Sequence, residues 1–465
     1  YTSPHTLSLH DALPIWPGQV IETNSLFASS FLSRLGAICT TYDLVRDDPP
    51  LIEETLQRAV SEQDLVLISS GTSAGRHDYS ARTIMKLGRL LFHGVAMLPG
   101  KPAILGEIGG KPVVGLPGYP VGSQTVLREL VAPFLVSWGL APLAGWIVRG
   151  RLARDMPSEL GFDEYVPVTV GSVNGSSWIF PHPRGSGLQM NLVRANGYLH
   201  IPLASEGWES GAWVNIHCTS LPHQIDRTLL CVGAKNPGIT QLAYALANRS
   251  VMLQSFYDLH SRALHSLKNN SCNMVALNIP GLEFNPGMFD GLKDVSAVAL
   301  HIGRMQVGIG SRTGAGILDL ANLRIANAPP GSTGRMVIDR LLTEQTINPD
   351  QVLGNGNSVK TEAAVISVVI NGRADAGICS AVLAREAGLA FVPITYESHV
   401  LVARNESIED ERIHSLLQIL QSPEFRDSLD YCYDTTLTGK VEECNTGSWQ
   451  EVSFLDNWIS DSGGG

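Results

Sequence analysis

The chain has 465 residues, of which 44% are hydrophobic and 17% are charged, so it has enough apolar side chains for several folded cores. Its formal net charge of −11 argues against a general nucleic-acid-binding protein, which would need a basic face to contact phosphates. This charge does not exclude a small-anion site, because a few backbone N–H groups can hold an anion on an acidic protein.

The cysteines and the hydropathy pattern indicate a cellular compartment. The 7 cysteines are scattered and include no Cys-x-x-Cys pair, which favours a reducing compartment over a disulfide framework or a zinc site. There is no apolar run of about 18 residues, and no basic region followed by an apolar one at the N-terminus. We therefore expect a cytoplasmic protein with no membrane partner.

Residues 1–16 show neither a periodic pattern nor a helix cap, and we expect them to be a non-native segment. From residue 17 to residue 140 the sequence alternates helical and strand patterns, which predicts a doubly wound α/β domain with its site at the carboxyl ends of the strands. The predicted elements, in order, are a helix from Thr23-Asn24, a strand at 37–45, a helix from Pro49, a strand at 64–70, a helix from about Asp78, two strands in 102–116 around Gly109-Gly110, and a helix near Pro120.

Three further segments follow a Pro- and Gly-containing linker at 141–150. Residues 151–222 hold short alternating runs without a long helical period, which predicts a small all-β domain. Residues 227–445 return to α/β alternation, and 446–465 form a tail that ends in a Gly-rich segment. In 227–445 we expect strands at 229–233, 305–308, 323–327, 374–378 and 389–394, and helices from Pro237 and at 334–342.

The most distinctive loop follows the buried strand 64–70 and precedes a helix. Its glycines allow close approach to a ligand, and its hydroxyls and free N–H groups favour anionic oxygens. Asp78 lies at the helix start, where it either caps the helix or holds a metal; an ordinary strand-to-helix turn is an equally good interpretation. The candidate ligand-binding residues here are Ser70, Gly71, Thr72, Ser73 and Gly75.

Two Pro-Gly turns are expected at the same edge of the sheet. They contain Gly100 and Gly118, and Lys101 supplies a point charge suited to phosphate or molybdate. Each turn alone is explained by simple turn chemistry. Together with Asp47 and Asp48 and the preceding loop, they predict an anion-and-metal pocket.

Five motifs occur in the order found in the molybdopterin molybdotransferase (MoeA-type) family, and the chain resembles that family between residues 17 and 120. They are 17–25, similar to GQI-x-D-T-N; 46–49, similar to R/P-D-D-P; 69–79, similar to SGGVSVGxxDY; 100–102, similar to PGKP; and 115–120, similar to GLPGNP. In the β segment, 185–188 and 209–214 resemble the GSG turn and the closing GExV strand of the family's last domain.

The resemblance implies an enzyme of molybdenum cofactor biosynthesis that inserts molybdate into adenylylated molybdopterin, uses Mg²⁺ and releases AMP. It implies that Asp47, Asp48 and Asp78 are carboxylates on the metal or molybdate side. Lys101 would contact phosphate or oxyanion, and the loop 70–75 would hold the pterin phosphate. The family also implies a homodimer for the full-length protein.

The sequence departs from the family pattern at three places. Leu98 stands where the family often has lysine, and Tyr119 replaces the usual asparagine. The Gly-Asp-Glu strand end expected just before Pro17 and the family's two N-terminal domains are missing from the sequence. We therefore expect an N-terminally truncated chain that binds its substrate without necessarily turning it over.

The C-terminal α/β part contains a second donor-rich turn. Ser332 and Thr333 follow a predicted strand and open a helix, which suits either an anion site or a capped turn. Residues 331–335, 371–377 and 389–394 resemble the periplasmic-binding-protein-like domains fused to MoeA-type proteins, which are similar to LysR effector domains. This predicts a two-lobed domain that binds a small anion or a cofactor precursor, and Asp375 would either face its cleft or lie in a solvated turn.

Two alternatives to the molybdotransferase remain open. The chain could be a non-catalytic cytoplasmic sensor or binding protein for molybdate, tungstate or a cofactor precursor. A molybdopterin adenylyltransferase shares the central fold, but the β segment after Arg151 argues against it, because that enzyme usually consists of the central domain alone.

Overall fold

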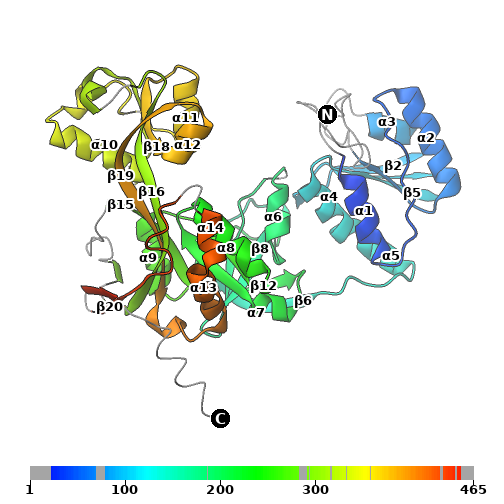
Figure 1. The fold of residues 1–465 in the computed structure, drawn as a ribbon. Helices are drawn as coiled ribbons and strands as arrows, with labels where there is room; N and C mark the ends of the chain where they lie inside the picture. The colour runs from blue at the N-terminus through cyan, green and yellow to red at the C-terminus, as the bar shows by residue number, and fades with distance from the viewer. Residues whose placement is uncertain are drawn as a thin grey trace, which may run out of the picture. The chain divides into compact units, whose positions relative to one another are not determined.

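The computed structural model describes residues 22–69, 79–185, 187–281, 291–292, 294–314, 317–330, 332–356, 358–429, 433–445 and 448–451 (Figure 1). The chain divides into two compact units. The first comprises Tyr1–Val170 and Ile179–Pro222, and the second comprises Gly171–Trp178 and His223–Gly465. Ser70, Gly71, Thr72, Ser73, Gly75 and Asp78 therefore lie outside the described residues.

The first unit begins with a four-stranded mixed sheet in the order β1-β5-β4-β2. The β1–β5 pair is parallel, and the other two pairs are antiparallel. The strands are β1 (Val66–Ser69), β2 (Arg89–His93), β4 (Ile104–Ile108) and β5 (Lys111–Leu116), and the helices are α1 (Asn24–Ser33), α2 (Pro49–Glu62), α3 (Tyr79–Leu87), α4 (Pro120–Val126), a π-helix (Leu127–Val131) and α5 (Ala132–Ser137).

Helices cover both faces of this sheet, because its strands alternate apolar side chains between two cores. Val113 of β5 joins a core with residues of α2 and α3, whereas Val114 and Leu116 join a core with residues of α1, α4 and α5. A strand buried on both faces needs such a continuous apolar run. The α/β class predicted from the sequence is confirmed.

The strand predicted at 37–45 is wrong. This segment has no regular structure, although a helix does begin at Pro49 as predicted. A strand needs a hydrogen-bonded neighbour and a covered face, yet no described strand pairs with 37–45. Ile38, which a covered strand face would bury, is 96% exposed.

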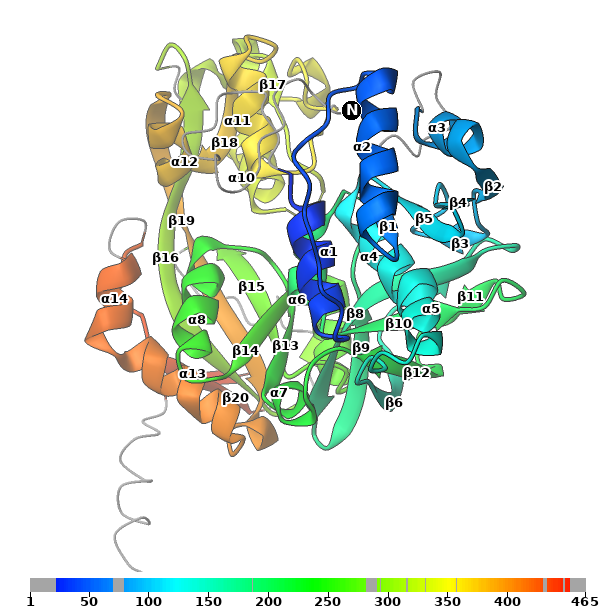
Figure 2. The same cartoon turned by 90° about the vertical axis from the view of Figure 1, so that its right-hand side faces the viewer.

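The first unit ends in a small closed barrel (Figure 2). Its strands follow the order β10-β12-β6-β9-β8, and β10 also pairs with β8, which closes the ring. Strand β3 (Met97–Leu98) extends β8 in parallel. The elements are β6 (Trp146–Leu152), β7 (Met156–Pro157), β8 (Asp163–Val173), β9 (Ser176–Pro181), α6 (Gln189–Arg194), β10 (Gly197–Ile201), β11 (Gly207–Trp208) and β12 (Trp213–Cys218).

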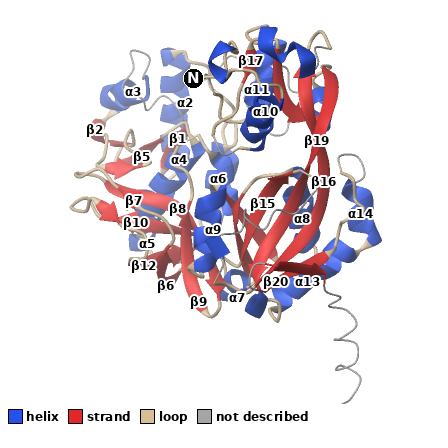
Figure 3. Cartoon of the chain, turned by 90° about the vertical axis from the view of Figure 1, so that its left-hand side faces the viewer, coloured by secondary structure: helices blue, strands red, loops and turns tan. Residues whose placement is uncertain are grey.

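The second unit is built around one large sheet in the order β14-β13-β15-β19-β16-β18-β17, with β20 and β21 added through β16 (Figure 3). Two strands of 15 residues, β16 (Ala297–Ser311) and β19 (Ala390–Arg404), run antiparallel through both lobes. The other strands are β13 (Thr228–Gly233), β14 (Met252–Tyr257), β15 (Met274–Pro280), β17 (Ile325–Ala326), β18 (Ala376–Ser380), β20 (Val441–Asn445) and β21 (Ser448–Glu451).

The two lobes of the second unit have separate apolar cores. One core joins β13, β15 and the ends of β16 and β19 to α8, α13 and α14, and the other joins β17, β18 and the opposite ends to α10. The helices are α7 (Pro222–Asp226), α8 (Pro237–Ala247), α9 (His260–Lys268), α10 (Thr333–Glu344), α11 (Glu362–Ile370), α12 (Ala381–Glu386), α13 (Glu411–Gln421) and α14 (Pro423–Leu429), with short 3₁₀ helices at Ile317–Asn322, Pro349–Gln351 and Asn405–Ser407.

None of the helices described in either unit is long and apolar enough to cross a bilayer.

Candidate functional site

A single buried amide connects the end of one strand to the loop after another at the carboxyl edge of the first sheet. Asn24, the first residue of α1, is 6% exposed. Its Nδ2 donates hydrogen bonds to Ser69 Oγ at 3.0 Å and to the Gly118 carbonyl oxygen at 2.9 Å. Ser69 ends β1, and Gly118 follows β5. These are the two parallel strands, and ligands of α/β sheets bind beyond the carboxyl ends of such strands.

From the sequence, Thr23 and Asn24 are predicted only to begin a helix. The capping role belongs instead to Glu22, whose carboxylate accepts the Ser25 N–H at 3.0 Å. This leaves the Asn24 amide free to reach across the sheet edge. The signal that pointed to Asn24 was its place in the motif at 17–25, not any local pattern of hydrophobicity.

The loop after β5 carries an exposed aromatic ring. Tyr119 is 63% exposed, although its carbonyl oxygen accepts the Ser123 N–H at 3.0 Å in the first turn of α4. A Cβ built on Gly187 would lie 3.6 Å from the Tyr119 ring, so the chain at Gly187 passes beside this ring. The structure therefore brings Gly118, Tyr119 and Gly187 together.

The turn at Gly100 and Lys101 requires a residue without a side chain at position 100. Gly100 has φ of +127°, and a Cβ there would lie 2.7 Å from Met97 Cε and 3.3 Å from Val126 Cγ2. Only glycine adopts this backbone without strain and allows so close an approach. Lys101 is exposed, and its Nζ lies 4.8 Å from the centre of the Phe162 ring. Its positive charge is thus presented to solvent beside an aromatic ring.

Two neighbouring carboxylates are the candidate metal ligands that the structure describes. Asp47 and Asp48 are exposed immediately before α2, and the Asp48 side chain makes no capping hydrogen bond to that helix. Among the described residues, no three His, Cys, Asp or Glu side chains gather into a metal site. This donor set fits Mg²⁺, which is commonly held by one or two carboxylates together with substrate phosphates, and does not form an all-protein cage.

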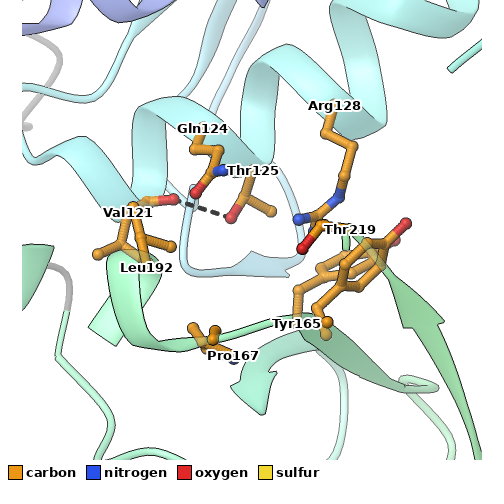
Figure 4. A pocket seen from close by; sticks show the side chains of 11 residues that line it. Val121, Gln124, Thr125, Arg128, Tyr165, Pro167, Leu192 and Thr219 are labelled. Carbon is orange, nitrogen blue, oxygen red and sulfur yellow. Dashed lines mark hydrogen bonds between the residues drawn. The ribbon is translucent and has the colours of Figure 1, made fainter. Parts of the chain in front are cut away.

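A small cavity lies where α4 and the π-helix meet the barrel (Figure 4). It has a volume of about 30 Å³, enough for water-sized molecules. Arg128 lines it, with its guanidinium carbon 3.4 Å from the Tyr198 ring centre and 5.4 Å from that of Tyr165. Gln124 Oε1 and Arg128 Nη2 are buried there without a hydrogen-bond partner among the described residues. Ordered water would satisfy both atoms.

In the second unit, the predicted turn at Ser332 and Thr333 forms the N-terminal cap of a helix. Ser332 Oγ accepts the Arg335 N–H at 3.4 Å and donates to the Pro329 carbonyl at 2.6 Å. It therefore caps α10, which begins at Thr333. Asp375 is also used locally, because its carboxylate accepts the Arg324 N–H at 2.8 Å. Of the two interpretations left open for each residue, these contacts favour the structural one.

A buried polar chain near the middle of β19 was not predicted. The Gly238 N–H donates to Tyr433 Oη at 3.0 Å, and Tyr433 Oη lies 2.6 Å from His399 Nδ1. His399 Nε2 lies 2.6 Å from Glu397 Oε1. A consistent assignment has Tyr433 donating to Nδ1 and His399 donating from Nε2 to the carboxylate. This chain ties the start of α8 to the long strand that continues into the other lobe.

Three separate segments of the chain match models of known protein families. Residues 6–137 match the probable molybdopterin binding domain, residues 149–218 match the MoeA C-terminal region (domain IV), and residues 243–421 match the PBP superfamily domain. The resemblance and the fold class expected from the sequence are thereby confirmed. The chain joins a MoeA-like part to a periplasmic-binding-protein-like part.

Individual relatives match less than half of the chain. It is 34% identical over 200 residues to a putative molybdopterin biosynthesis protein of Methanocaldococcus jannaschii, covering 43% of this chain and 48% of the relative. It is 27% identical over 208 residues to a molybdopterin molybdenumtransferase of a Nostoc species, covering 43% and 47%. A solved MoeA protein from Pyrococcus horikoshii is 29% identical with a TM-score of 0.40, covering 46% and 52%. The chain spans about half the length of these relatives.

Proposed function

We propose that this chain, whose first unit combines a molybdopterin-binding domain with a MoeA C-terminal region, acts in molybdenum cofactor biosynthesis as a molybdopterin molybdotransferase. The reaction inserts molybdate into adenylylated molybdopterin and releases AMP. The observation that carries this proposal is the Asn24 bridge, which joins Ser69 at the end of β1 to Gly118 after β5 at the carboxyl edge of the sheet. The relatives named above support it.

In this proposal each part of the site has a distinct task. Lys101 attracts the phosphate or molybdate oxyanion, and the turns at Gly100 and Gly118 let the backbone approach the substrate closely. Residues Ser70, Gly71, Thr72, Ser73 and Gly75 supply N–H groups and hydroxyls to the phosphate. Asp47, Asp48 and Asp78 hold Mg²⁺, which neutralises charge on the substrate phosphates when bound.

The test is magnesium- and molybdate-dependent AMP release from adenylylated molybdopterin by the full chain. We expect Asp78→Ala to abolish the reaction and Lys101→Met to slow it roughly 10- to 100-fold, the loss expected for a charge-assisted contact. The matched control is Lys86→Met, which removes an exposed lysine that pairs with Glu53 on α2. If Asp78→Ala and Lys101→Met both match the unsubstituted chain, the site assignment is wrong.

A second function is favoured by the two-lobed second unit. Its long strands β16 and β19 connect two separately packed lobes, an architecture suited to holding a small ligand. The chain would then sense or bind molybdate, tungstate or a cofactor precursor without chemistry of its own. Calorimetric titration of the full chain with molybdate distinguishes the sites. Loss of heat in Lys101→Met assigns binding to the first unit, and loss in Thr333→Val assigns it to the second.

The remaining expectations are also proposals. We propose a cytoplasmic location, and a homodimer for the full-length protein. Sedimentation of the chain with and without its substrate measures the oligomeric state directly.

A further inference from the structure

The side chain of Tyr119 is exposed although its backbone is fixed on both sides. The preceding Gly118 carbonyl accepts a hydrogen bond from Asn24 Nδ2 at 2.9 Å, and α4, which begins at Pro120, buries its second residue Val121 to 5% exposure. Tyr119 as a whole residue is nevertheless 63% exposed. Within the described part of the chain, no hydrogen bond holds the Tyr119 hydroxyl. The fold therefore positions this ring without burying it.

The surroundings of the ring limit where a ligand can approach. Gly187 lies beside one edge of the ring, and a Cβ there would make an ordinary contact at 3.6 Å with Cδ1 and Cε1. Two residues later, Gln189 Nε2 donates to Thr23 Oγ1 at 3.3 Å, next to the start of α1. The start of α6 and the loop before α4 are thus both hydrogen-bonded to the start of α1, through Thr23 and Asn24.

We infer that Tyr119 is a specificity residue that stacks against a planar heteroaromatic ring of the substrate, an inference that rests on the proposed function. An exposed, fixed aromatic ring at the carboxyl edge of an α/β sheet offers a flat apolar surface to such a ring. Phosphate contacts alone do not recognise a ring system. The proposed substrate carries two candidates, the pterin and the adenine of its adenylyl group, and both have the chemistry that stacks on tyrosine.

The test measures the binding of two separate probes to the full chain. A free pterin is followed by its fluorescence, and AMP is followed by calorimetry. Tyr119→Phe keeps the ring, so its affinities should stay within about 2-fold of the unsubstituted chain. Tyr119→Leu removes the ring and should weaken one probe roughly 5- to 100-fold, the usual contribution of base stacking on an aromatic side chain. Tyr244→Leu, which removes a ring 68% exposed in the second unit, is the control.

Each pattern of results decides the inference. Weakening of the pterin alone by Tyr119→Leu assigns the ring to the pterin, and weakening of AMP alone assigns it to adenine. Equal weakening of both supports stacking but overturns the role in specificity. Equal loss in Tyr119→Phe and Tyr119→Leu would place the contact at the hydroxyl and overturn the stacking role. Unchanged affinities in Tyr119→Leu overturn it while leaving the proposed function intact. Failure of the unsubstituted chain to bind either probe overturns both.

Discussion

At the scale of single residues, Asn24 shows how one side chain organises the proposed site. Its two amide hydrogens are used on two different acceptors, Ser69 Oγ and the Gly118 carbonyl, which are 45 and 94 residues away in the sequence. An aspartate has the same shape but no donor. The arrangement therefore depends on the amide and not on the size of the side chain.

We predict that Asn24→Ala lowers the free energy of unfolding of the first unit by about 1–3 kcal/mol, because it removes two part-buried hydrogen bonds that each contribute about 0.5–1.5 kcal/mol. Asn24→Asp should cost more, because a carboxylate oxygen then faces the Gly118 carbonyl. Urea unfolding of the full chain measures both, and Asn215→Ala, at an exposed position of β12, is the control. If both Asn24 variants unfold at the control's midpoint, the bridge has no structural role.

At the scale of elements, the π-helix at Leu127–Val131 places a cation against the barrel. Arg128 lies over the Tyr198 ring, which in turn stacks on His217 with ring centres 5.0 Å apart and an angle of 10°. A π-helical turn changes the direction in which side chains project and is often found at functional positions. Here it aims a guanidinium at the barrel from the helix that begins directly after Tyr119.

A double-mutant cycle between Arg128→Met and Tyr198→Leu should give a coupling energy of about 1–2 kcal/mol, since this cation–π pair is partly desolvated. The matched cycle uses Arg58→Met and Tyr42→Leu, because the exposed Arg58 lies 5.3 Å from the ring centre of the half-buried Tyr42. It should give less than about 1 kcal/mol. Equal couplings for the two pairs would show that the contact at Arg128 is an ordinary surface contact.

The elements also show which features the sequence predicts. Gly109 and Gly110 have φ of +59° and +79°, and the hairpin of β4 and β5 was predicted because a Gly-Gly pair suits this turn. The full length of β16 and β19 was not predicted. Polar residues such as Arg304 and Glu397 interrupt their apolar pattern, and only pairing between the two strands continues them. The prediction of a strand at 37–45 was wrong for the opposite reason. Its apolar residues suit a strand, but no described strand pairs with this segment.

The candidate site also contains residues that the sequence predicted and residues that it did not. Lys101, Gly100 and Gly118 were identified from motif order, because glycine and lysine at turns carry local signals. Arg128, Tyr433 and the bridging role of Asn24 were missed, because each acts on residues far away in the sequence. The Gly238–Tyr433 bond, for example, spans 195 residues. Local patterns contain no information about such pairs.

At the scale of the whole molecule, the two units differ in their response to acid. Burial, with a smaller effect of Arg194, lowers the pKa of His182 in the barrel to about 4, and burial also lowers the pKa of His217. In the second unit, the pKa of Glu442 is lowered to about 2, chiefly by its hydrogen bond with His301, with help from Lys440. The shifted pKa values of His182 and Glu442 therefore make the free energy of unfolding depend on pH in different ranges.

The sign of each effect follows from which state binds more protons. Unfolded chains protonate histidine near pH 6.5, whereas folded His182 stays neutral to about pH 4, so stability is lost as the pH falls between these values. Glu442 contributes stability above about pH 4.5, and this contribution is lost as the pH falls toward 2. Through these groups, mild acid weakens the first unit before the second.

We therefore predict that lowering the pH from 7 to 5 costs the first unit up to roughly 2 kcal/mol through His182. Differential scanning calorimetry of the full chain should show one transition moving to lower temperature over this range. His182→Gln should flatten that shift, because glutamine does not titrate but can still donate to Thr169 Oγ1, which lies 2.9 Å from His182 Nε2. His265→Gln, at an exposed position of α9, should leave the shift unchanged. A pH dependence that survives in His182→Gln would mean that another group makes the first unit sensitive to acid.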